Sequence, residues 1–268
     1  MNRAENIVKL KLDVVFKRMF GNENHKDIIK GFISDMLEIP MESIKTIYIN
    51  NSELTPDYVY QKFSRLDLRL DVDGRVVNIE MQVNSVPNFT DRTLFYWAKM
   101  YSDELHTGEE YDSLKRTICI NILNFNLFDC EDYHSHFKIM ESDRHEVLTD
   151  NFAIHFFELK KIGKSQHRKR MEEWLMLINA ETEEELMKIE KTTTSPEIKA
   201  TIVKLRELSA DERFKQEAFM REKRLHDEAS ALKGARQEGR QERENEIVKN
   251  LRERGYSEEE IREIIRKR

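Results

Sequence analysis

The chain has 268 residues, of which 39% are hydrophobic and 36% charged, and its formal net charge is −6 at pH 7. This length suits one or two domains, and the low numbers of Gly (8) and Pro (4) exclude collagen-like and linker-like classes. Neither a long apolar run nor an apolar N-terminal segment is present, so we expect no membrane span and no secretory signal. Two cysteines are too few for a disulfide framework, and we expect a cytoplasmic protein.

The charges are unevenly distributed. Residues 211–268 contain 16 basic and 15 acidic side chains, whereas residues 1–210 have a net charge of −7. An acidic balance argues against a generic nucleic-acid binder, because attraction to phosphates needs a cationic surface. One basic stretch, residues 160–170, is an exception, and four of its side chains are candidate DNA contacts: Lys160, Lys161, Lys164 and Arg168. A solvated loop that leads into a helix explains the same stretch equally well.

In chain order, hydrophobic periodicity predicts helices over 10–20 and 26–37, then a β-branched strand over 44–50. A helix over 89–106 follows, and strands are predicted over 117–125, 136–140 and 153–159. From about residue 168 the pattern is helical almost throughout. Thr182 and Glu185 form the signature of a capping box, as do Ser257 and Glu260 near the C-terminus.

The segment 211–253 is long, highly charged and without a sustained apolar heptad. Two alternatives fit this pattern: a single polar helix, or a helix that pairs with another chain. His134 and His136 stand two residues apart on a predicted strand, a spacing that would suit a metal clip. No third ligand is evident in the sequence, so we favour a surface position for both histidines.

The segment 64–83 carries the most specific pattern of the chain. Two alternating apolar and polar runs flank Asp73-Gly74, a pair that strongly predicts a two-residue β-hairpin turn. If these two residues form the turn, the numbers of directly paired residues add up to 147. Asp67 then lies opposite Glu80 on the polar face, and their Cβ atoms are about 5 Å apart. Two such carboxylates either repel each other in water or hold one divalent cation, and periodicity alone favours an ordinary polar face.

The residues around this hairpin resemble a known family. The matching blocks are LDVVFKRMFG (12–21), LDLRLDVDGRVVNIEMQ (66–82), DRTLFYWAKMYSDELHTGEEYDSLKRTICINILNF (91–125), IHFFELKK (154–161) and the tail LRERGYSEEEIREI. Together they resemble the Rpn family of recombination-promoting nucleases and transposases, within the PD-(D/E)XK nuclease superfamily. The resemblance covers most of the chain and implies an α/β fold, a restriction-endonuclease-like mixed sheet flanked by helices, with a helical C-terminal extension.

The resemblance also implies roles for individual residues. Asp67 and Glu80 would bind Mg²⁺ or Mn²⁺, with the backbone carbonyl of Met81 as a third ligand and Asp13 as an additional acidic group. An ordinary helix-terminal aspartate is an equal alternative for Asp13. Gln82 stands where the superfamily has a lysine and would orient the attacking water, although glutamine supplies no charge. Two cations are candidates to supply it, Lys17 and Arg92, and surface charge is the alternative for both. Arg92 is also a candidate DNA contact.

The implied function is a magnesium-dependent DNA endonuclease that hydrolyses phosphodiester bonds with a metal-activated water and is associated with DNA recombination or mobile elements. The alternative is a non-catalytic binding or regulatory module on a degenerate nuclease core, which the acidic balance and the missing lysine favour. We expect a nuclease core over 1–165, a helical subdomain over 166–210 and a charged helical tail over 211–268. DNA is the expected partner, together with a second copy of the chain bound through the C-terminal helices.

Overall fold

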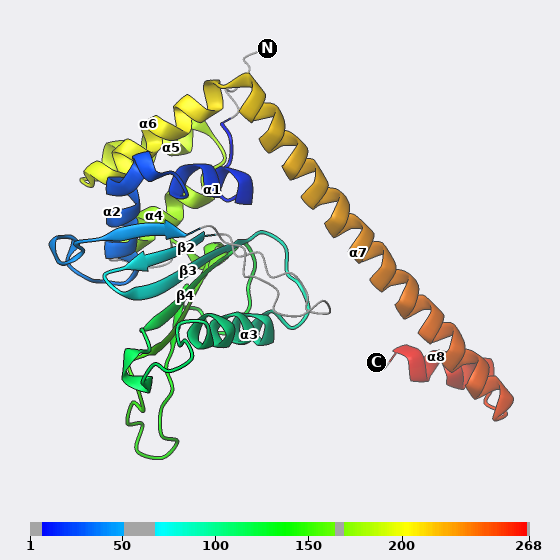
Figure 1. Cartoon of the computed structure of the whole chain (residues 1–268). Helices are drawn as coiled ribbons and strands as arrows, with labels where there is room; N and C mark the ends of the chain where they lie inside the picture. Colours follow the sequence, from blue (N-terminus) through cyan, green and yellow to red (C-terminus); the bar gives the residue numbers. More distant parts are fainter. Residues whose placement is uncertain (1–6, 51–67, 164–168, 267–268) are drawn as a thin grey trace, which may run out of the picture. The chain divides into compact units, whose positions relative to one another are not determined.

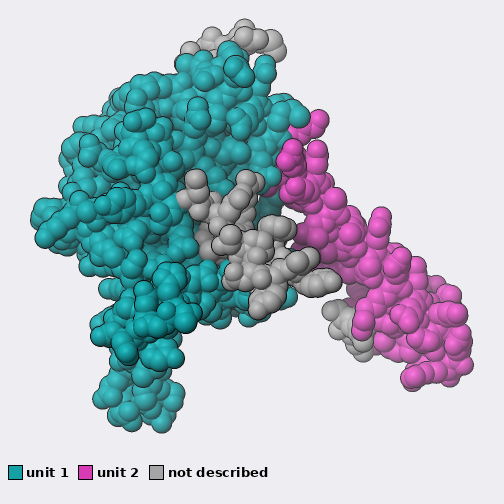
Figure 2. Space-filling model, viewed as in Figure 1, with its two compact units in different colours: residues 1–221 teal, residues 222–268 magenta. Residues whose placement is uncertain are grey.

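The computed structural model describes residues 7–50, 68–163 and 169–266. The chain divides into two compact units, Met1–Arg221 and Glu222–Arg268, which Figure 2 shows in different colours. The first unit contains the sheet and most of the helices, and the second contains the end of the chain. The three-part division at residues 165 and 210 stays a prediction.

A mixed six-stranded sheet forms the centre of the first unit, as the sequence predicts. Its strands are β1 (Ile47–Asn50), β2 (Leu68–Val72), β3 (Arg75–Gln82), β4 (Thr117–Leu123), β5 (His134–Phe137) and β6 (Phe152–Glu158). They lie in the order β1-β2-β3-β4-β6-β5. The central strands β3, β4 and β6 are parallel, whereas β2 pairs with β3, β1 with β2 and β5 with β6 in the antiparallel direction. Every residue of β4 and β6 is buried, which is typical of parallel strands covered on both faces.

The turn between β2 and β3 has the geometry that its sequence predicts. Asp73 and Gly74 have φ angles of 50° and 74°, so both occupy the left-handed region that a type I′ turn needs. The register follows from the turn, because Leu68 pairs with Ile79 and Leu70 with Val77. The predicted register, in which paired numbers add up to 147, is therefore confirmed for the described part of the hairpin.

Helices cover both faces of the sheet (Figure 1). On one face lies α3 (Phe89–Ser102), and on the other lie α1 (Asp13–Phe20), α2 (Lys26–Met36) and α4 (Arg170–Asn179). Further along the chain come α5 (Glu183–Thr192) and α6 (Pro196–Ala210), which complete the helical layer together with α2 and α4. The capping box of α5 is confirmed, because Thr182 accepts a hydrogen bond from the Glu185 amide and Glu185 bonds back to the Thr182 amide.

Each face of the sheet has its own hydrophobic core. On the α2 side, Phe20, Phe32 and Trp174 are fully buried, and the Phe32 and Trp174 rings meet edge to face with centroids 5.3 Å apart. The indole nitrogen of Trp174 donates to Asp35, so this polar atom is satisfied inside the layer. On the α3 side, Phe89 and Met100 of the helix pack on alternate residues of the central strands: Val76, Cys119, Leu123, Phe152, Ile154 and Phe156.

One strand differs from its expected position. The sequence predicts a strand over 136–140, whereas β5 covers His134–Phe137. The chain leaves the sheet after Phe137, and Met140 bridges to Val147 in a separate turn of backbone. The apolar residues of this excursion have the same alternation as a sheet strand, but here they pair locally, so their pattern misplaces the strand by two to three residues.

The chain continues into α7 (Glu212–Glu253) and α8 (Glu258–Arg266). Only Phe214 and Ala218 of α7 are buried, in agreement with its charged sequence. Ser257 and Glu260 bond to each other's backbone amides, so the predicted cap of α8 is confirmed. Within the described ranges, every helix is either too short or too polar to pass through a bilayer.

Candidate metal and nucleic-acid site

The site lies on β3, on the face of the sheet that α3 covers. Because side chains alternate along a strand, Asn78, Glu80 and Gln82 share this face with Val76, which packs in the α3 core. Val77, Ile79 and Met81 point to the other face. This alternation places the three polar side chains of the NIEMQ motif together on one side of the sheet.

Glu80 and Gln82 stand near the carboxyl end of their strand. Glu80 pairs with Asn121 of the parallel strand β4, and Gln82, the last residue of β3, pairs with Leu123. In open α/β sheets, ligands bind outside the carboxyl ends of the strands, where the connections diverge. The position in the sheet therefore agrees with a ligand site.

Arg92 of α3 joins the two side chains. Its Nη2 atom donates to Glu80 Oε1 at 2.6 Å and to Gln82 Oε1 at 2.8 Å. The amide group of Gln82 is oriented by its own nitrogen, which donates to the Asn84 carbonyl at 2.9 Å. One cationic nitrogen thus sits between a carboxylate oxygen and an amide oxygen, and both oxygens face the same point.

Two aromatic rings of α3 hold the guanidinium of Arg92. Its central carbon lies 4.9 Å from the centroid of the Phe89 ring and 5.9 Å from that of Tyr96. Phe89 is buried in the core below α3, so the ring next to Arg92 is fixed by packing. Cation–π contacts of this kind contribute about 0.5–1 kcal/mol each.

The Glu80 side chain is largely shielded from solvent, whereas that of Arg92 is partly exposed. The Glu80 side chain is 11% exposed and that of Arg92 31%. Burial raises the pKa of the neighbouring Cys119 thiol, and the negative charge of Glu80 raises it further. Cys119 therefore stays protonated beside the carboxylate and is no thiolate ligand.

Asp67, the expected partner of Glu80, lies outside the described residues. The described register reaches Leu68, which pairs with Ile79. The pairing of Asp67 with Glu80 therefore stays a prediction.

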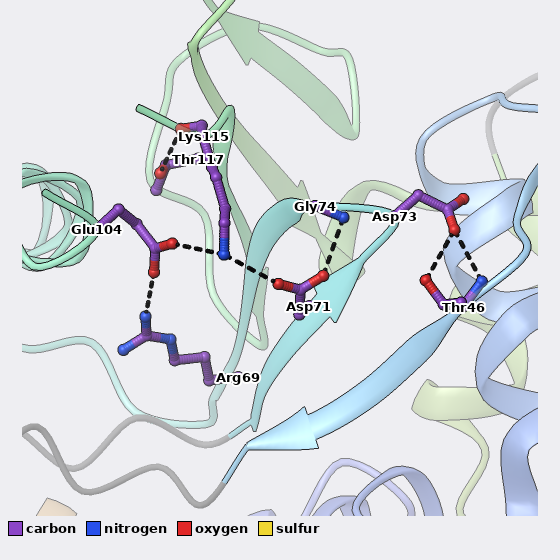
Figure 3. A network of polar contacts seen from close by, with 8 residues as sticks. All are labelled: Thr46, Arg69, Asp71, Asp73, Gly74, Glu104, Lys115 and Thr117. Carbon is purple, nitrogen blue, oxygen red and sulfur yellow. Dashed lines mark hydrogen bonds and ion pairs between the residues drawn. The ribbon is translucent and has the colours of Figure 1, made fainter. Parts of the chain in front are cut away.

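A second polar network fixes the hairpin that carries Glu80 (Figure 3). Glu104, just beyond the end of α3, accepts from Arg69 at 2.7 Å and pairs with Lys115 at 3.0 Å. Lys115 also reaches Asp71, whose other oxygen accepts from the Gly74 amide. Burial opposes charge on Lys115, but its hydrogen bond to Glu104 outweighs this and raises the lysine pKa. The hairpin is thus tied to α3 near the helix's C-terminal end as well as through Arg92.

The turn of the hairpin is also anchored to β1. Asp73 accepts hydrogen bonds from the amide and the hydroxyl of Thr46 and from the Lys45 amide. The Thr46 amide is the largest influence that lowers the pKa of this carboxyl. Asp71 and Asp73, two further acidic residues of the hairpin, are therefore engaged in structural contacts.

Two of the predicted site residues, Asp13 and Lys17, lie on α1 and not on the strand that carries Glu80. The carboxylate of Asp13 forms an ion pair with Arg221 at 2.8 Å, which joins α1 to the start of α7. This ion pair gives Asp13 a structural role that needs no metal. Lys17, also on α1, is partly exposed. The metal role of Asp13, the catalytic role of Lys17 and the carbonyl ligand from Met81 stay predictions.

The basic stretch after β6 is not uniformly available to DNA. Lys160 is exposed, but the side chain of Lys161 is only 5% exposed and its amine bonds to Glu158 and to the Phe128 carbonyl, both at 2.7 Å. This burial argues against the expected contact of Lys161 with a phosphate backbone. Lys164 and Arg168 lie outside the described residues.

The histidines of β5 have a third partner that the sequence did not indicate. His155 of β6 pairs with His136, and its Nδ1 atom lies 3.0 Å from Nε2 of His134. The ring of His155 is nearly parallel to those of His134 and His136, at 10° and 15°. Nδ1 of His155 and Nε2 of His134 are hydrogen-bond partners of each other, so these two nitrogens do not converge on a metal position. Burial lowers the pKa of His134 to about 4 and that of His155 to about 3.

The residues at Glu80 fit a hard cation. No group of three or more His, Cys, Asp or Glu side chains within the described ranges is arranged to hold a metal ion. At Glu80, however, a carboxylate and an amide oxygen already share one positive group, the Arg92 nitrogen. Carboxylate and carbonyl oxygens are the donors that Mg²⁺ and Mn²⁺ prefer. A second carboxylate would complete this set, and Asp67 is the residue expected there.

A comparison with known families agrees with this arrangement. Residues 10–235 match the model of a family described as PD-(D/E)XK nuclease family transposase. No curated protein and no solved structure matches the chain. The matched range includes the hairpin, α3 and all three central strands, and the mixed sheet with helices on both faces is consistent with the fold of that family. The chain belongs to the PD-(D/E)XK nuclease family of transposases, which supports a nuclease-like function.

Proposed function

We propose that this protein is a metal-dependent endonuclease that hydrolyses phosphodiester bonds of DNA, in a process such as recombination or the movement of mobile elements. The observation that carries the proposal is the meeting of Glu80 and Gln82 with one positive group near the carboxyl end of β3. Membership in the nuclease family supports the same conclusion.

The proposal assigns the metal to Glu80 and Asp67, with the Met81 carbonyl as a further ligand and Asp13 as a possible outer group. A bound Mg²⁺ or Mn²⁺ ion would polarise a phosphoryl oxygen and lower the pKa of a bound water. The ligands are hard oxygen donors, as Mg²⁺ requires. Water is the nucleophile in this proposal, so no covalent intermediate with the protein forms.

In this proposal, Gln82 and Arg92 together replace the lysine of the superfamily: Gln82 accepts the hydrogen bond and Arg92 is a candidate source of positive charge. The Gln82 amide is held by the Asn84 carbonyl, so its oxygen has a fixed direction and can accept a hydrogen bond from the attacking water. Arg92, which contacts the glutamine oxygen at 2.8 Å in the metal-free structure, is the first candidate for the positive charge that glutamine lacks. Lys17 is the second candidate for this charge.

The proposal includes a DNA surface and self-association. Lys160 is an exposed cation of the basic stretch after β6, and Lys164 and Arg168 are its expected neighbours. Cations of this kind position the phosphate backbone without reading sequence. The charged C-terminal helices are proposed to bind a second copy of the chain. A monomeric mass by light scattering would contradict this last point.

The test is a plasmid-nicking assay in Mg²⁺ and in Mn²⁺. We expect cleavage by the unaltered protein and a loss of at least about a hundredfold for Glu80→Gln and Asp67→Asn, the size typical of removing one group that stabilises developing charge. The matched control is Asp129→Asn, which removes a carboxylate from an exposed position after β4. Gln82→Lys restores the superfamily's lysine, and we expect it to keep or raise the cleavage rate.

The same set of variants separates this function from a non-catalytic binding module. A binding module predicts equal, background cleavage for all of them and no Mn²⁺ binding that depends on Glu80. Equal nicking by the unaltered protein, Glu80→Gln and Asp67→Asn would overturn the nuclease assignment. Parallel assays with single-stranded RNA of the same length decide between DNA and RNA as substrate.

A further inference from the structure

Arg92 contacts the two oxygens of the site without the forked geometry that is usual for a stable arginine ion pair. A single nitrogen, Nη2, makes both contacts, whereas the buried Nε atom of the same side chain has no hydrogen-bond partner among the described residues. Arg206 of α6 shows the contrasting arrangement. It uses Nε, Nη1 and Nη2 together against Glu183 and Glu190, in the forked geometry that makes arginine pairs strong.

The end-on contact makes Arg92 resemble a small cation at this point. Its Nη2 atom occupies the position where the lone pairs of Glu80 Oε1 and Gln82 Oε1 meet, at 2.6 and 2.8 Å. A divalent ion bound by the same two oxygens would need that position. Both cations cannot be there together, because the arginine nitrogen fills the space and like charges in contact repel each other strongly.

The surroundings allow the guanidinium to leave. The Arg92 side chain is 31% exposed, so it can move outward without crossing the core. Phe89 and Tyr96 bind the guanidinium through their rings, and these contacts allow sliding because they are not directional in the way a forked hydrogen bond is. After leaving Glu80, the freed group would stand at the rim of the site, where a phosphate of the substrate is the natural partner for a guanidinium.

We propose that Arg92 is an internal competitor of the metal ion: it holds Glu80 and Gln82 until a divalent cation displaces it, and the released guanidinium then binds a substrate phosphate. This inference rests on the proposed function. It has a thermodynamic consequence: DNA draws Arg92 away from Glu80, so DNA binding and metal binding strengthen each other, and the coupling must be reciprocal.

The experiment measures Mn²⁺ binding by calorimetry and by the electron paramagnetic resonance of free Mn²⁺, on the full chain without DNA. We expect Arg92→Gln to bind Mn²⁺ about ten- to a hundredfold more tightly than the unaltered protein, since one charge-assisted hydrogen bond no longer opposes the ion. Arg92→Lys keeps a competing charge, and its affinity should stay within about threefold of the unaltered protein. Lys99→Gln, a charge removal two turns further along α3, is the matched control and should change nothing.

Glu80→Gln separates failure of this inference from failure of the proposed function. If Glu80→Gln weakens Mn²⁺ binding while Arg92→Gln leaves it unchanged or weaker, the site binds metal but Arg92 is no competitor, and the inference is overturned alone. If Glu80→Gln has no effect on Mn²⁺ binding, the proposed metal site itself is wrong.

A second measurement uses Ca²⁺ and a short DNA duplex, with Ca²⁺ chosen to limit cleavage. We expect the duplex to raise the Ca²⁺ affinity of the unaltered protein severalfold and to leave that of Arg92→Gln nearly unchanged. An equal increase in both proteins would contradict the release of Arg92 onto phosphate. Far-ultraviolet circular dichroism of each variant shows whether the fold is retained.

Discussion

Two buried glutamates on the same face of the sheet have contrasting surroundings. Glu80 lies near the end of β3 and Glu158 is the last residue of β6, and both belong to the rows of residues that face α3. Both residues are buried, and each contacts a basic side chain. Sequence position and burial alone would therefore assign them similar roles.

The Glu158 carboxylate forms a closed pair with Lys161: it is shielded from solvent, and both of its oxygens accept hydrogen bonds. One of its oxygens accepts from the amides of Leu127 and Phe128, and the other accepts from the Lys161 amine at 2.7 Å. The same amine donates to the Phe128 carbonyl, so the lysine and the glutamate fix the loop after β4 as one unit. With side-chain exposures of 0% and 5%, neither charge has room for another partner.

The cation that pairs with Glu80 can be exchanged for another one. This cation is shared with a neutral amide through one nitrogen and is about a third exposed. The comparison teaches that a buried carboxylate does not by itself identify a site. What distinguishes Glu80 is a cation that can be replaced without leaving an unpaired charge in the core.

The variant with the largest expected effect on stability removes Lys161, the cation that pairs with Glu158. Lys161→Met leaves the Glu158 carboxylate buried without its ammonium, and we expect a loss of about 3–5 kcal/mol in the free energy of unfolding. Urea denaturation followed by circular dichroism measures this loss. Lys160→Met is the matched control, because the neighbouring lysine is exposed and should change stability by less than about 0.5 kcal/mol. Similar losses for both variants would show that the pair at Glu158 is not closed.

The next test neutralises each glutamate in the same way. Glu158→Gln leaves the buried Lys161 ammonium without its counter-charge, for an expected loss of about 3 kcal/mol. Glu80→Gln leaves Arg92, which water reaches, and we expect a loss of about 1 kcal/mol. Thermal and urea unfolding of the two variants give the difference. If Glu80→Gln is as damaging as Glu158→Gln, the carboxylate of β3 is a structural element and the contrast fails.

The sequence predicted the local parts of this picture. The β2–β3 register followed from Asp73-Gly74, because a two-residue turn fixes which residues face each other. The capping residues Thr182 and Ser257 were identified for the same reason, since caps depend on residues within one turn. Alternation along β3 also placed Glu80 and Gln82 on one face.

The sequence named Glu80, but its local pattern did not show why Glu158 is unavailable. Glu158-Leu159-Lys160 has the spacing of the superfamily's Glu-x-Lys motif, whereas Glu80-Met81-Gln82 lacks the lysine. Only the packing shows that Glu158 is closed by Lys161, and that Lys160 points to solvent from a short 3₁₀ turn. Contacts across the sheet, such as His155 with His134, are equally invisible in a local pattern.

Acid should destabilise the edge of the sheet next to Glu158 more than the region around Glu80. Burial, followed by the positive charge of His136, lowers the pKa of both His134 and His155, with further effects from Lys138, Arg116, Lys169 and Glu38. Well above pH 6.5 both histidines are neutral in the folded and unfolded chains, so their full contribution to stability is present. As the pH falls from 6.5 toward 4, the unfolded chain takes up protons that the folded chain does not, and stability is lost.

At pH 6 we expect a loss of about 1 kcal/mol from this pair of histidines. Hydrogen exchange should show it first at the amides of β5 and β6, while those of β2 and β3 stay protected. Replacement of His134 by Gln should flatten the dependence on pH, and replacement of the exposed His226 of α7 should not. Equal loss of protection in all strands would mean that acid acts on the whole fold.

The smallest test asks whether the backbone contributes to the contrast. Gly74 ends the turn before β3 and Gly163 follows the turn that carries Lys161, and both have positive φ angles, 74° and 86°. A Cβ atom at either position would meet nothing within 4 Å, so alanine there brings conformational strain without a clash. We expect Gly74→Ala and Gly163→Ala each to lose about 1 kcal/mol by urea denaturation. Gly239→Ala in the middle of α7 is the control with ordinary helical φ, and it should lose no stability. Equal losses at Gly74 and Gly163 would leave the side chains around each glutamate as the source of the difference, whereas a much larger loss at one glycine would place part of it in the backbone.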